Sequence, residues 1–399
     1  MKRAVLVVGA GASVEYKAPS TATITAEIER QIRADSWMIA SGGNKAFQLI
    51  KTELEAHLKA PGDVNFEHIY HCAHELIYWF ASSAGAVNEH GPILFPFIEH
   101  KTDLSKEALR ALCGKIVDVI YKTFSTACDN NPLDLAPLSA FISGLQSQFT
   151  TRIYTTNYDD FILQAVPDLY TGFPPRPSPG PKRFESKEFL AREDEHAVFH
   201  LHGSVHLGFP HPMPAGSEIG DLYWFDDRSE AIRHARFDGS DVSRMDGTSF
   251  MRTSVVTGLD KLSRLQQRPL AHYYAALARD MMCADVIYLI GSGLTDLHIN
   301  TWLREARAAR PVAPIIFVDY WPKPFLEATA WEYGSKEIHL FHDLYVHAKG
   351  PRGGIRSGTG WTVSPDRTSA IWDRGFQNFL TAPDELSAVL HELEVPASV

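Results

Sequence analysis

Short runs of apolar residues alternate along this chain with longer stretches in which apolar residues recur every three or four positions. An uninterrupted short run predicts a buried strand, and recurrence at three-four spacing predicts an amphipathic helix. Strands that alternate with helices are typical of an α/β protein with a parallel sheet. The predicted strands lie at 4–8, 152–160, 197–205, 285–293, 312–321 and 336–343.

A long helical stretch separates the first predicted strand from the second. From Thr21 to about Phe149 the apolar spacing is helical, for example in TAEIERQIRADSWMIA and KEALRALCGKIVDVIYKTFSTA. Further helices are predicted at 270–284 and 297–309, between later strands. We therefore predict an α/β fold: a Rossmann-like, doubly wound parallel sheet with a large helical subdomain inserted at 21–149.

The end of the chain differs in pattern from the rest. After Lys349 the sequence is rich in Gly and Arg and then only weakly helical. We assign residues 1–349 to the main domain and residues 350–399 to a C-terminal extension. No internal repeat is found in the sequence.

Composition and charge narrow the class of protein. Hydrophobic residues make up 45% of the chain and charged residues 22%, which is ordinary for a globular protein. The formal net charge of −10 argues against direct binding of nucleic acid or of an anionic membrane. The four cysteines lie far apart in the sequence, so neither a disulfide framework nor a four-cysteine zinc site is expected.

The first residues admit two interpretations. Lys2 and Arg3 before AVLVV imitate the start of a secretory signal, and the following Ala-Gly-Ala imitates its cleavage site. Against this, Gly9 ends the apolar run after few residues. No later segment reaches the ~18 consecutive apolar residues of a membrane helix. We favour a cytoplasmic protein in a reducing compartment.

The first predicted strand runs into the sequence GAGAS, residues 9–13. A strand, small residues and then a helix place backbone N–H groups where a phosphate can bind. The full dinucleotide fingerprint requires a third glycine where Val14 stands. A tight turn that binds no ligand therefore remains an alternative for this motif.

The second predicted strand ends in TTNYDD, which places Asn157, Asp159 and Asp160 at its carboxyl end. In parallel sheets these ends line the ligand crevice. The alternative is that these side chains cap the next helix, because Asn and Asp are favoured N-caps. We expect Asp160 to be such a cap and leave both interpretations open for Asn157.

The third predicted strand contains HLHGSVH, with His200, His202 and His206. A histidine before a glycine at a strand end suits a general base near neutral pH. A metal site formed by His200 and His202 is an alternative, as is a purely structural histidine. The segment EHIYHCAHE (67–75) offers further histidines, but its apolar stripe predicts an amphipathic helix.

Two later strand ends complete the set of candidates. GSG at 291–293, followed by Asp296, closes a buried strand with a glycine turn that could contact a phosphate or a ribose. Asp319 ends PIIFVD, where a carboxylate can hold ribose hydroxyls. Simple capping of the next turn is the alternative for Asp319.

In this order, GAGAS, TTNYD, HLHG, GSG and VD, the chain resembles the sirtuin family over islands between about residues 4 and 320. The resemblance implies that Asn157, Asp159 and His202 are catalytic, with Asp159 bonding the nicotinamide carboxamide. It implies that a set of turn residues binds NAD, with Asp319 on the adenosine ribose: Gly9, Ala10, Gly11, Ser13, Gly291, Ser292 and Asp319.

The chain also departs from the sirtuin deacylases. Their two C-x-x-C zinc pairs are missing after HLHG, where SVHLGFPHPMP contains no cysteine, and YKAPSTATI replaces G-I-P-D-F-R. These departures resemble bacterial sirtuin-like proteins of anti-phage defence. That resemblance implies a zinc-free NAD hydrolase that yields nicotinamide and ADP-ribose and depletes NAD in abortive infection. It further implies a homo-oligomer, and a separate partner or sensor protein is compatible with it.

Two alternatives to NAD hydrolysis remain open at this point. The first is an NAD-dependent protein deacylase, against which the missing zinc cysteines speak. The second is a subunit that binds NAD or ADP-ribose without chemistry, against which the presence of both Asn157 and His202 speaks. The trigger, the partner and the use of NADP are not encoded in any motif of the sequence.

Overall fold

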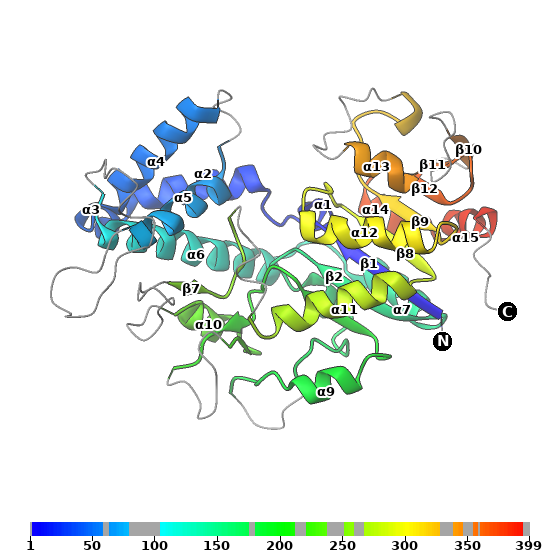
Figure 1. Cartoon of the computed structure of the whole chain (residues 1–399), viewed down its shortest axis with the longest axis horizontal. Helices are drawn as coiled ribbons and strands as arrows, with labels where there is room; N and C mark the ends of the chain where they lie inside the picture. Colours follow the sequence, from blue (N-terminus) through cyan, green and yellow to red (C-terminus); the bar gives the residue numbers. More distant parts are fainter. Residues whose placement is uncertain are drawn as a thin grey trace.

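A computed structural model describes residues 2–58, 64–79, 104–174, 180–211, 221–237, 251–258, 267–327, 338–345, 354–357 and 360–393. Its centre is an eight-stranded sheet with the spatial order β10-β11-β12-β9-β8-β1-β2-β3 (Figure 1). The strands of this sheet are β1 (Lys2–Val8), β2 (Phe149–Thr155), β3 (Ala197–His200), β8 (Val286–Ile290), β9 (Ile315–Val318), β10 (Ile355–Ser357), β11 (Trp361–Val363) and β12 (Ser369–Trp372).

The sheet is parallel over most of its width. From β3 across to β12 each neighbouring pair is parallel. At the other edge β11 pairs antiparallel with both β12 and β10. The chain runs outward from β1 through β2 to β3 and then returns to the other side of β1 with β8. This reversal beside β1 confirms the predicted doubly wound α/β fold and creates the crevice in which such sheets bind ligands.

Alternate side chains of β1 pack into two different hydrophobic cores. Val5 and Val7 belong to one buried cluster, whereas Ala4, Leu6 and Val8 belong to another. Because side chains alternate across a strand, a central strand covered on both faces must be apolar at every position. The central position of β1 in the sheet therefore explains why the run AVLVV contains no polar residue.

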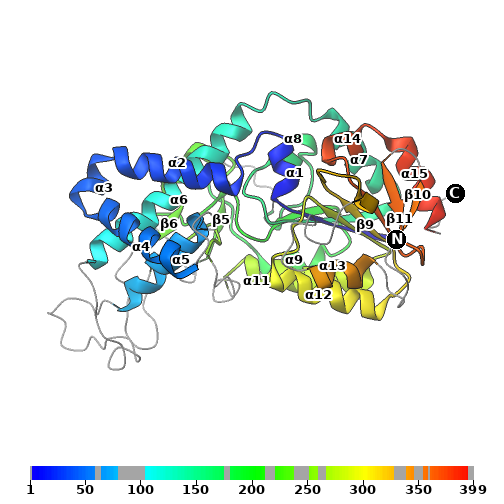
Figure 2. The ribbon, with the colours of Figure 1, turned by 90° about the horizontal axis from the view of Figure 1, so that it is seen from above.

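Helices cover both faces of the sheet (Figures 1 and 2). Figure 2 separates them into two layers, with α11, α12 and α13 on one side and α1, α7, α8, α14 and α15 on the other. The first layer comprises α11 (Leu270–Cys283), α12 (Leu297–Ala309) and α13 (Ile338–Tyr345), and α9 (Ser186–Ala191) lies on the same side. The second comprises α1 (Ala10–Glu15), α7 (Ala136–Gln146), α8 (Phe161–Ala165), α14 (Phe376–Leu380) and α15 (Pro383–Glu392).

The inserted helices form a block beside one end of the sheet, at the left of Figure 1. The long helix α6 is its centre and contacts α2, α4 and α5. Its apolar face includes Leu109, Leu112, Ile116 and Ile120, all fully buried. The helices of the block are α2 (Thr21–Ala34), α3 (Ser36–Ala40), α4 (Gly43–Leu58), α5 (Phe66–Trp79) and α6 (Lys106–Asp129).

Short elements follow β3 under the block. They are β4 (Leu207–Gly208), β5 (Tyr223–Trp224), α10 (Arg228–Ala231), a 3₁₀ turn at Ile232–His234, β6 (Arg236–Phe237) and β7 (Arg252–Thr253). Two pairs of them, β4 with β5 and β6 with β7, form separate two-stranded ribbons. A further 3₁₀ turn, Phe325–Glu327, follows β9.

Two predictions of secondary structure were wrong. The segment 336–343 was expected to be a strand, but its described part belongs to helix α13. Leu340, Phe341, Leu344 and Tyr345 are buried there, which is a helical spacing that the apparent alternation in IHLFH conceals. Beyond Lys349 only weak helix was expected, yet β10, β11 and β12 extend the central sheet. Strands of three or four residues are too short to show a period.

Within the described part of the chain, no helix is both long and apolar enough to cross a membrane.

The Asp280 side chain of α11 is in contact with several charged and polar groups. Its fully buried carboxylate accepts hydrogen bonds from Arg152 Nε at 2.8 Å, from the Tyr154 hydroxyl and from Arg3. Arg279 adds a contact at 3.0 Å. Asp280 thus joins α11 to β1 and β2, and its removal would leave the buried Arg152 guanidinium without a counter-charge.

We expect Asp280→Ala to lower the free energy of unfolding by about 3–5 kcal/mol, because it leaves a buried charge uncompensated. Urea titration followed by circular dichroism measures the change. Asp168→Ala, at an exposed aspartate, is the matched control and should unfold like the wild type. Equal midpoints for the two variants would contradict a structural role for the Asp280 cluster.

Candidate active site

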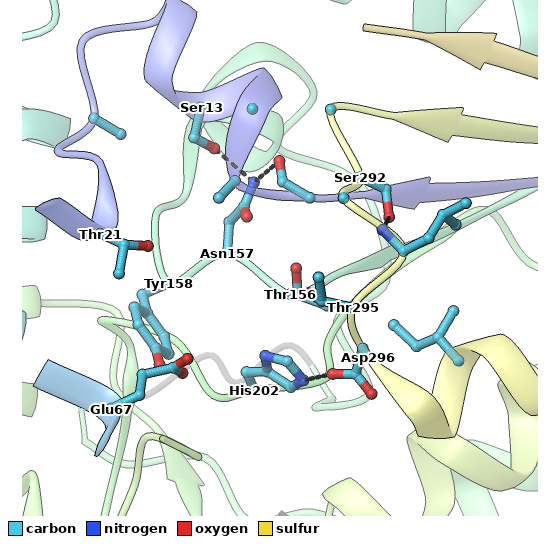
Figure 3. A pocket seen from close by; sticks show the side chains of 18 of the residues that line it. Ser13, Thr21, Glu67, Thr156, Asn157, Tyr158, His202, Ser292, Thr295 and Asp296 are labelled. Carbon is cyan, nitrogen blue, oxygen red and sulfur yellow. Dashed lines mark hydrogen bonds and ion pairs between the residues drawn. The ribbon is translucent and has the colours of Figure 1, made fainter. Parts of the chain in front are cut away.

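A cavity of about 450 Å³ opens at the carboxyl ends of β1, β2, β8 and β9 (Figure 3). Its volume lies in the range of small-molecule sites, roughly 300–1,000 Å³. Most of the predicted site residues line it: Gly9, Ala10, Gly11, Ser13, Asn157, His202, Gly291, Ser292 and Asp319. The structure therefore brings together strand ends that are up to 310 positions apart in the sequence (Gly9 and Asp319).

The glycines of the two turns are required by the close approach of their backbones. A Cβ on Gly291 would lie 2.1 Å from the Ala12 nitrogen, and one on Gly9 would lie 2.5 Å from the Gly291 oxygen. Gly291 also has a φ of +58°, in the left-handed region that favours glycine. The Gly11 N–H donates to the Gly291 carbonyl at 3.0 Å. Packing explains these glycines first, and the predicted phosphate contacts remain a prediction.

The Asn157 side chain has a defined orientation. Its Nδ2 donates to the Gly9 carbonyl at 2.9 Å and to Ser13 Oγ at 2.7 Å (Figure 3). A carbonyl oxygen can only accept, so the nitrogen must face Gly9 and the amide cannot be flipped. Oδ1 is thereby left as the acceptor atom for the cavity. Asn157 does not cap α8, and it lines the cavity. Its role in a reaction stays a prediction.

Ser13 binds Asn157 and affects the pKa of Asp159. The Ser13 hydroxyl accepts from Asn157, and its hydrogen bonding opposes the rise in the pKa of Asp159. Burial nevertheless raises that pKa to about 6. Asp159 is only 5% exposed and is not part of the cavity lining formed by the described residues. Its expected bond to a nicotinamide carboxamide stays a prediction. Asp159 Oδ1 accepts from the Phe161 N–H at 3.4 Å, at the start of α8.

His202 occupies a turn that only glycine can complete. Gly203 has a φ of +93°, and a Cβ there would lie 2.3 Å from the Ser254 carbonyl oxygen. The turn directs His202 into the cavity, while Val256 N–H donates to the His202 carbonyl at 2.7 Å. His200 points elsewhere: its Nδ1 donates to the Asn157 carbonyl at 3.2 Å, and burial lowers its pKa to about 4. His202 therefore faces the cavity, whereas His200 supports the backbone at Asn157.

Asp296 is the partner of His202, a role that the sequence did not reveal. Its Oδ2 lies 2.6 Å from His202 Nε2 (Figure 3). The sequence had suggested only a phosphate or ribose contact for this residue. The two are 94 positions apart, so no local spacing could have paired them. The position of Asp296 just before a helix is nonetheless the visible signal of an N-cap.

A buried ion cluster holds the segment after Asn157. Asp160 Oδ2 lies 2.9 Å from His206 Nε2 and also binds Arg228. Burial would raise the pKa of Asp160, but hydrogen bonding to His206 and the nearby positive charge outweigh it and lower the pKa. Asp160 stands at the N-cap position of α8, yet its side chain makes no capping bond. The expectation that Asp160 caps this helix was wrong, because these partners hold its carboxylate.

The far wall of the cavity comes from the helical block. Thr21 and Ile24 of α2, Phe66 and Glu67 of α5 and Phe124 of α6 line it. Figure 3 shows the Glu67 side chain on the same side of the cavity as His202. Nothing in the sequence distinguished these positions from ordinary helix faces.

Ser292 and Asp319 line the cavity just after the ends of β8 and β9. Burial raises the pKa of Asp319 to about 6, although the Tyr320 N–H donates to its Oδ1 at 2.8 Å. Ser292 Oγ accepts from the Leu294 N–H at 3.4 Å. Both residues thus support their own turns and also face the cavity, so the capping and binding interpretations are compatible.

Two histidines of the segment 67–75 are engaged in other contacts. His74 Nε2 lies 3.2 Å from the Met251 carbonyl oxygen, and Asn65 N–H donates to His68 Nδ1 at 3.3 Å. Over the residues that the structure describes, no group of three or more His, Cys, Asp or Glu side chains is placed to hold a metal ion.

The arrangement is suited to chemistry on a polar ligand with acidic and hydroxyl groups. It offers an oriented amide oxygen, a histidine paired with a carboxylate, and two strand-end turns on the cavity wall. An imidazole can move a proton near neutral pH, and a paired carboxylate stabilises its charged form.

Comparison with known proteins finds a match to a family model over part of the chain. Residues 151–338 match the family model of the SIR2-like domain. This range contains Asn157, His202, Asp296 and Asp319, whereas the GAGAS turn precedes it. No curated protein matches the chain.

Solved Sir2 structures superpose on the chain only loosely. A mutant Sir2 homologue in complex with 2′-O-acetyl ADP ribose is 14% identical, with 86% of this chain and 92% of that chain covered and a TM-score of 0.37. A Sir2 homolog–NAD complex is 13% identical, with 86% and 91% covered and a TM-score of 0.36. Sir2Tm bound to a propionylated peptide is 13% identical, with 81% and 83% covered and a TM-score of 0.31.

We expect Asp159→Asn to stabilise the fold increasingly as pH rises. The pKa of Asp159 is about 6 in the folded protein, above the ordinary value of about 4. The folded protein binds the Asp159 proton more tightly than the unfolded chain, and this stabilises the fold. The stabilisation is fully present below about pH 4 and is lost as pH rises through about 6. Between pH 4 and 7 the variant should gain roughly 3 kcal/mol relative to wild type.

Urea unfolding midpoints at several pH values measure this difference. Asp168→Asn, which replaces an exposed aspartate, should show no such trend. A difference between Asp159→Asn and wild type that does not change with pH would contradict the assignment.

Proposed function

We propose that this protein is an NAD hydrolase that cleaves the nicotinamide–ribose bond and releases nicotinamide and ADP-ribose. The observation that carries the proposal is the joint placement of Asn157 and His202 on one cavity at the carboxyl ends of the sheet. Both belong to the segment that matches the SIR2-like domain. NAD is the substrate here, and the proposed reaction requires no zinc.

The chemistry of this cleavage fits the groups present. The bond between ribose C1′ and the nicotinamide nitrogen breaks, and its electron pair leaves with neutral nicotinamide. The ribose then resembles an oxocarbenium ion, as in glycoside cleavage. Water adds to C1′ and gives one proton to His202, which passes it to solvent. The Asn157 Oδ1 would hold the attacking water or a ribose hydroxyl.

The turn residues would hold the rest of the substrate. We assign the pyrophosphate to Gly9, Ala10, Gly11 and Ser13, with Gly291 and Ser292 assisting. We assign the adenosine ribose to Asp319. With Asp319 at one end of the cavity, the nicotinamide would lie toward the wall formed by the helical block. Asp159 would act through Ser13, given its burial.

In the cell, the enzyme would deplete NAD during phage infection and would be silent until triggered. We propose that it is a cytoplasmic homo-oligomer, with or without a separate partner or sensor protein. This role follows from the resemblance in sequence to zinc-free sirtuin-like defence proteins. Because depletion of NAD would harm the host cell, the activity must be kept off until infection. We propose that assembly of the protein switches it on.

We expect Asn157→Ala and His202→Ala to abolish release of nicotinamide from NAD. Loss of a general base alone costs about 100- to 10,000-fold in rate. Chromatographic measurement of free nicotinamide and ADP-ribose tests this, with unfolding midpoints to show that both variants are folded.

Asn378→Ala and His391→Ala, at exposed positions of α14 and α15, are the matched controls and should retain activity. An active wild type with unaffected Asn157 and His202 variants would refute the site. NAD-dependent turnover of an acetylated peptide would instead support a deacylase. Tight NAD binding without turnover would support a non-catalytic subunit.

We expect the NAD hydrolase activity per molecule to rise steeply with protein concentration, because association stabilises the assembled form by mass action. Nicotinamide release over a range of enzyme concentrations, with light scattering on the same samples, measures this. A specific activity that is constant while the oligomeric state changes would rule out control by self-assembly.

A further inference from the structure

The two oxygens of Asp296 have different tasks at the edge of the cavity. Oδ1 accepts from the His298 N–H at 3.2 Å and so caps helix α12. Oδ2 lies 2.6 Å from His202 Nε2 (Figure 3). The side chains of His202 and Asp296 are only 7% and 12% exposed. The carboxylate therefore cannot turn away from His202 without losing the cap.

The charge of Asp296 favours one of the two positions for the hydrogen on the His202 ring. A carboxylate at a helix N-terminus is favoured in its ionised form by the helix dipole. The Asp296 and His202 contact is an ion-pair distance of 2.6 Å. A lone pair on the ring nitrogen would be repelled by the negative oxygen at this distance, so the charge of the carboxylate favours a hydrogen on Nε2. Neutral His202 then has its hydrogen on Nε2 and its lone pair on Nδ1. Figure 3 shows that other ring nitrogen directed away from Asp296, on the side of the cavity where Thr156 and Asn157 lie.

We propose that Asp296 is a positioning residue that holds His202 in the Nε2–H tautomer and makes Nδ1 the base. The proposal rests on the NAD hydrolysis described above. One O–H bond of water breaks, its oxygen bonds to C1′, and its proton moves to Nδ1. The resulting imidazolium lies against the Asp296 carboxylate, whose charge stabilises it. Nicotinamide leaves with the glycosidic electron pair, so no oxidant or second substrate is needed.

Other ionisable groups surround this pair. Glu67 reaches the cavity from α5, and Tyr274 approaches from α11. Burial raises the pKa of Tyr274, and the charge of Asp296 raises it further. Burial keeps the pKa of Tyr274 above its ordinary value in these variants, so this group does not titrate in the acid limb of the pH profile.

Asp296→Asn and Asp296→Ala separate the two tasks of this residue. Asparagine is as good an N-cap as aspartate, so α12 keeps its cap. Its amide is neutral and can present N–H to the ring, which permits the other tautomer of His202. We expect Asp296→Asn to lower kcat for NAD hydrolysis by about 100- to 10,000-fold with KM little changed. Asp296→Ala should lose the same activity and also unfold at lower urea.

The pH profile supplies a readout that a structural role would not move. Removal of an opposite charge beside a histidine lowers its pKa by about one to three units. The acid limb of kcat/KM in the residual activity of Asp296→Asn should therefore move to lower pH by that amount. Asp227→Asn, at the exposed N-cap of α10, is the control and should leave kcat and the limb unchanged.

The outcomes distinguish this proposal from the function on which it rests. A wild type that leaves NAD intact overturns both. An active wild type with an inactive His202→Ala and a fully active Asp296→Asn overturns the positioning role alone. A less active Asp296→Asn whose acid limb is unshifted, and which unfolds as early as Asp296→Ala, also overturns it. Loss of kcat with a shifted limb and an unchanged urea midpoint supports it.

Discussion

The close contact between the ends of β1 and β8 is the constraint on which the site depends. There the chain leaves two neighbouring parallel strands in opposite directions, and the turns meet at Gly9, Gly11 and Gly291. The Gly11 N–H donates to the Gly291 carbonyl, and no side chain fits between these backbones. From this contact α1 begins on one side, and the turn that leads to α12 begins on the other.

Each of these two helices carries a side chain that orients a candidate catalytic residue. Ser13 of α1 accepts from Asn157 Nδ2, and Asp296 at the start of α12 faces His202 Nε2. Ser13 and Asp296 lie in or at the start of a helix, so the helices fix their positions. Active groups held in this way lose little freedom when a substrate binds, which is a condition for efficient catalysis. The close packing of the glycine turns thus fixes where α1 and α12 begin. These two helix starts in turn orient the side chains of Asn157 and His202.

The helical block adds the wall that the sheet cannot provide. Residues of α2, α5 and α6 face the strand ends across the cavity. Below them, the Asp160, His206 and Arg228 cluster ties the segment after Asn157 to the short elements under the block. The block and the sheet therefore share one site, and a displacement of α2 or α5 would change the shape of the cavity. The proposed control by assembly would reach the cavity through this coupling.

The sequence by itself determined the central strands, because AVLVV and VIYLI are apolar at every position and only a doubly covered strand requires that. It also placed Asn157, His202 and Asp319 at strand ends, since strand order along the chain is a local property. It could not pair His202 with Asp296 or bring Glu67 to the cavity, because these contacts join segments that are distant along the chain. It misassigned α13, where a short apolar segment fits both periods, and it missed the short strands that follow. Only the tertiary structure decided which polar groups are buried together, because burial and hydrogen-bond partners depend on packing between elements rather than on the spacing within one.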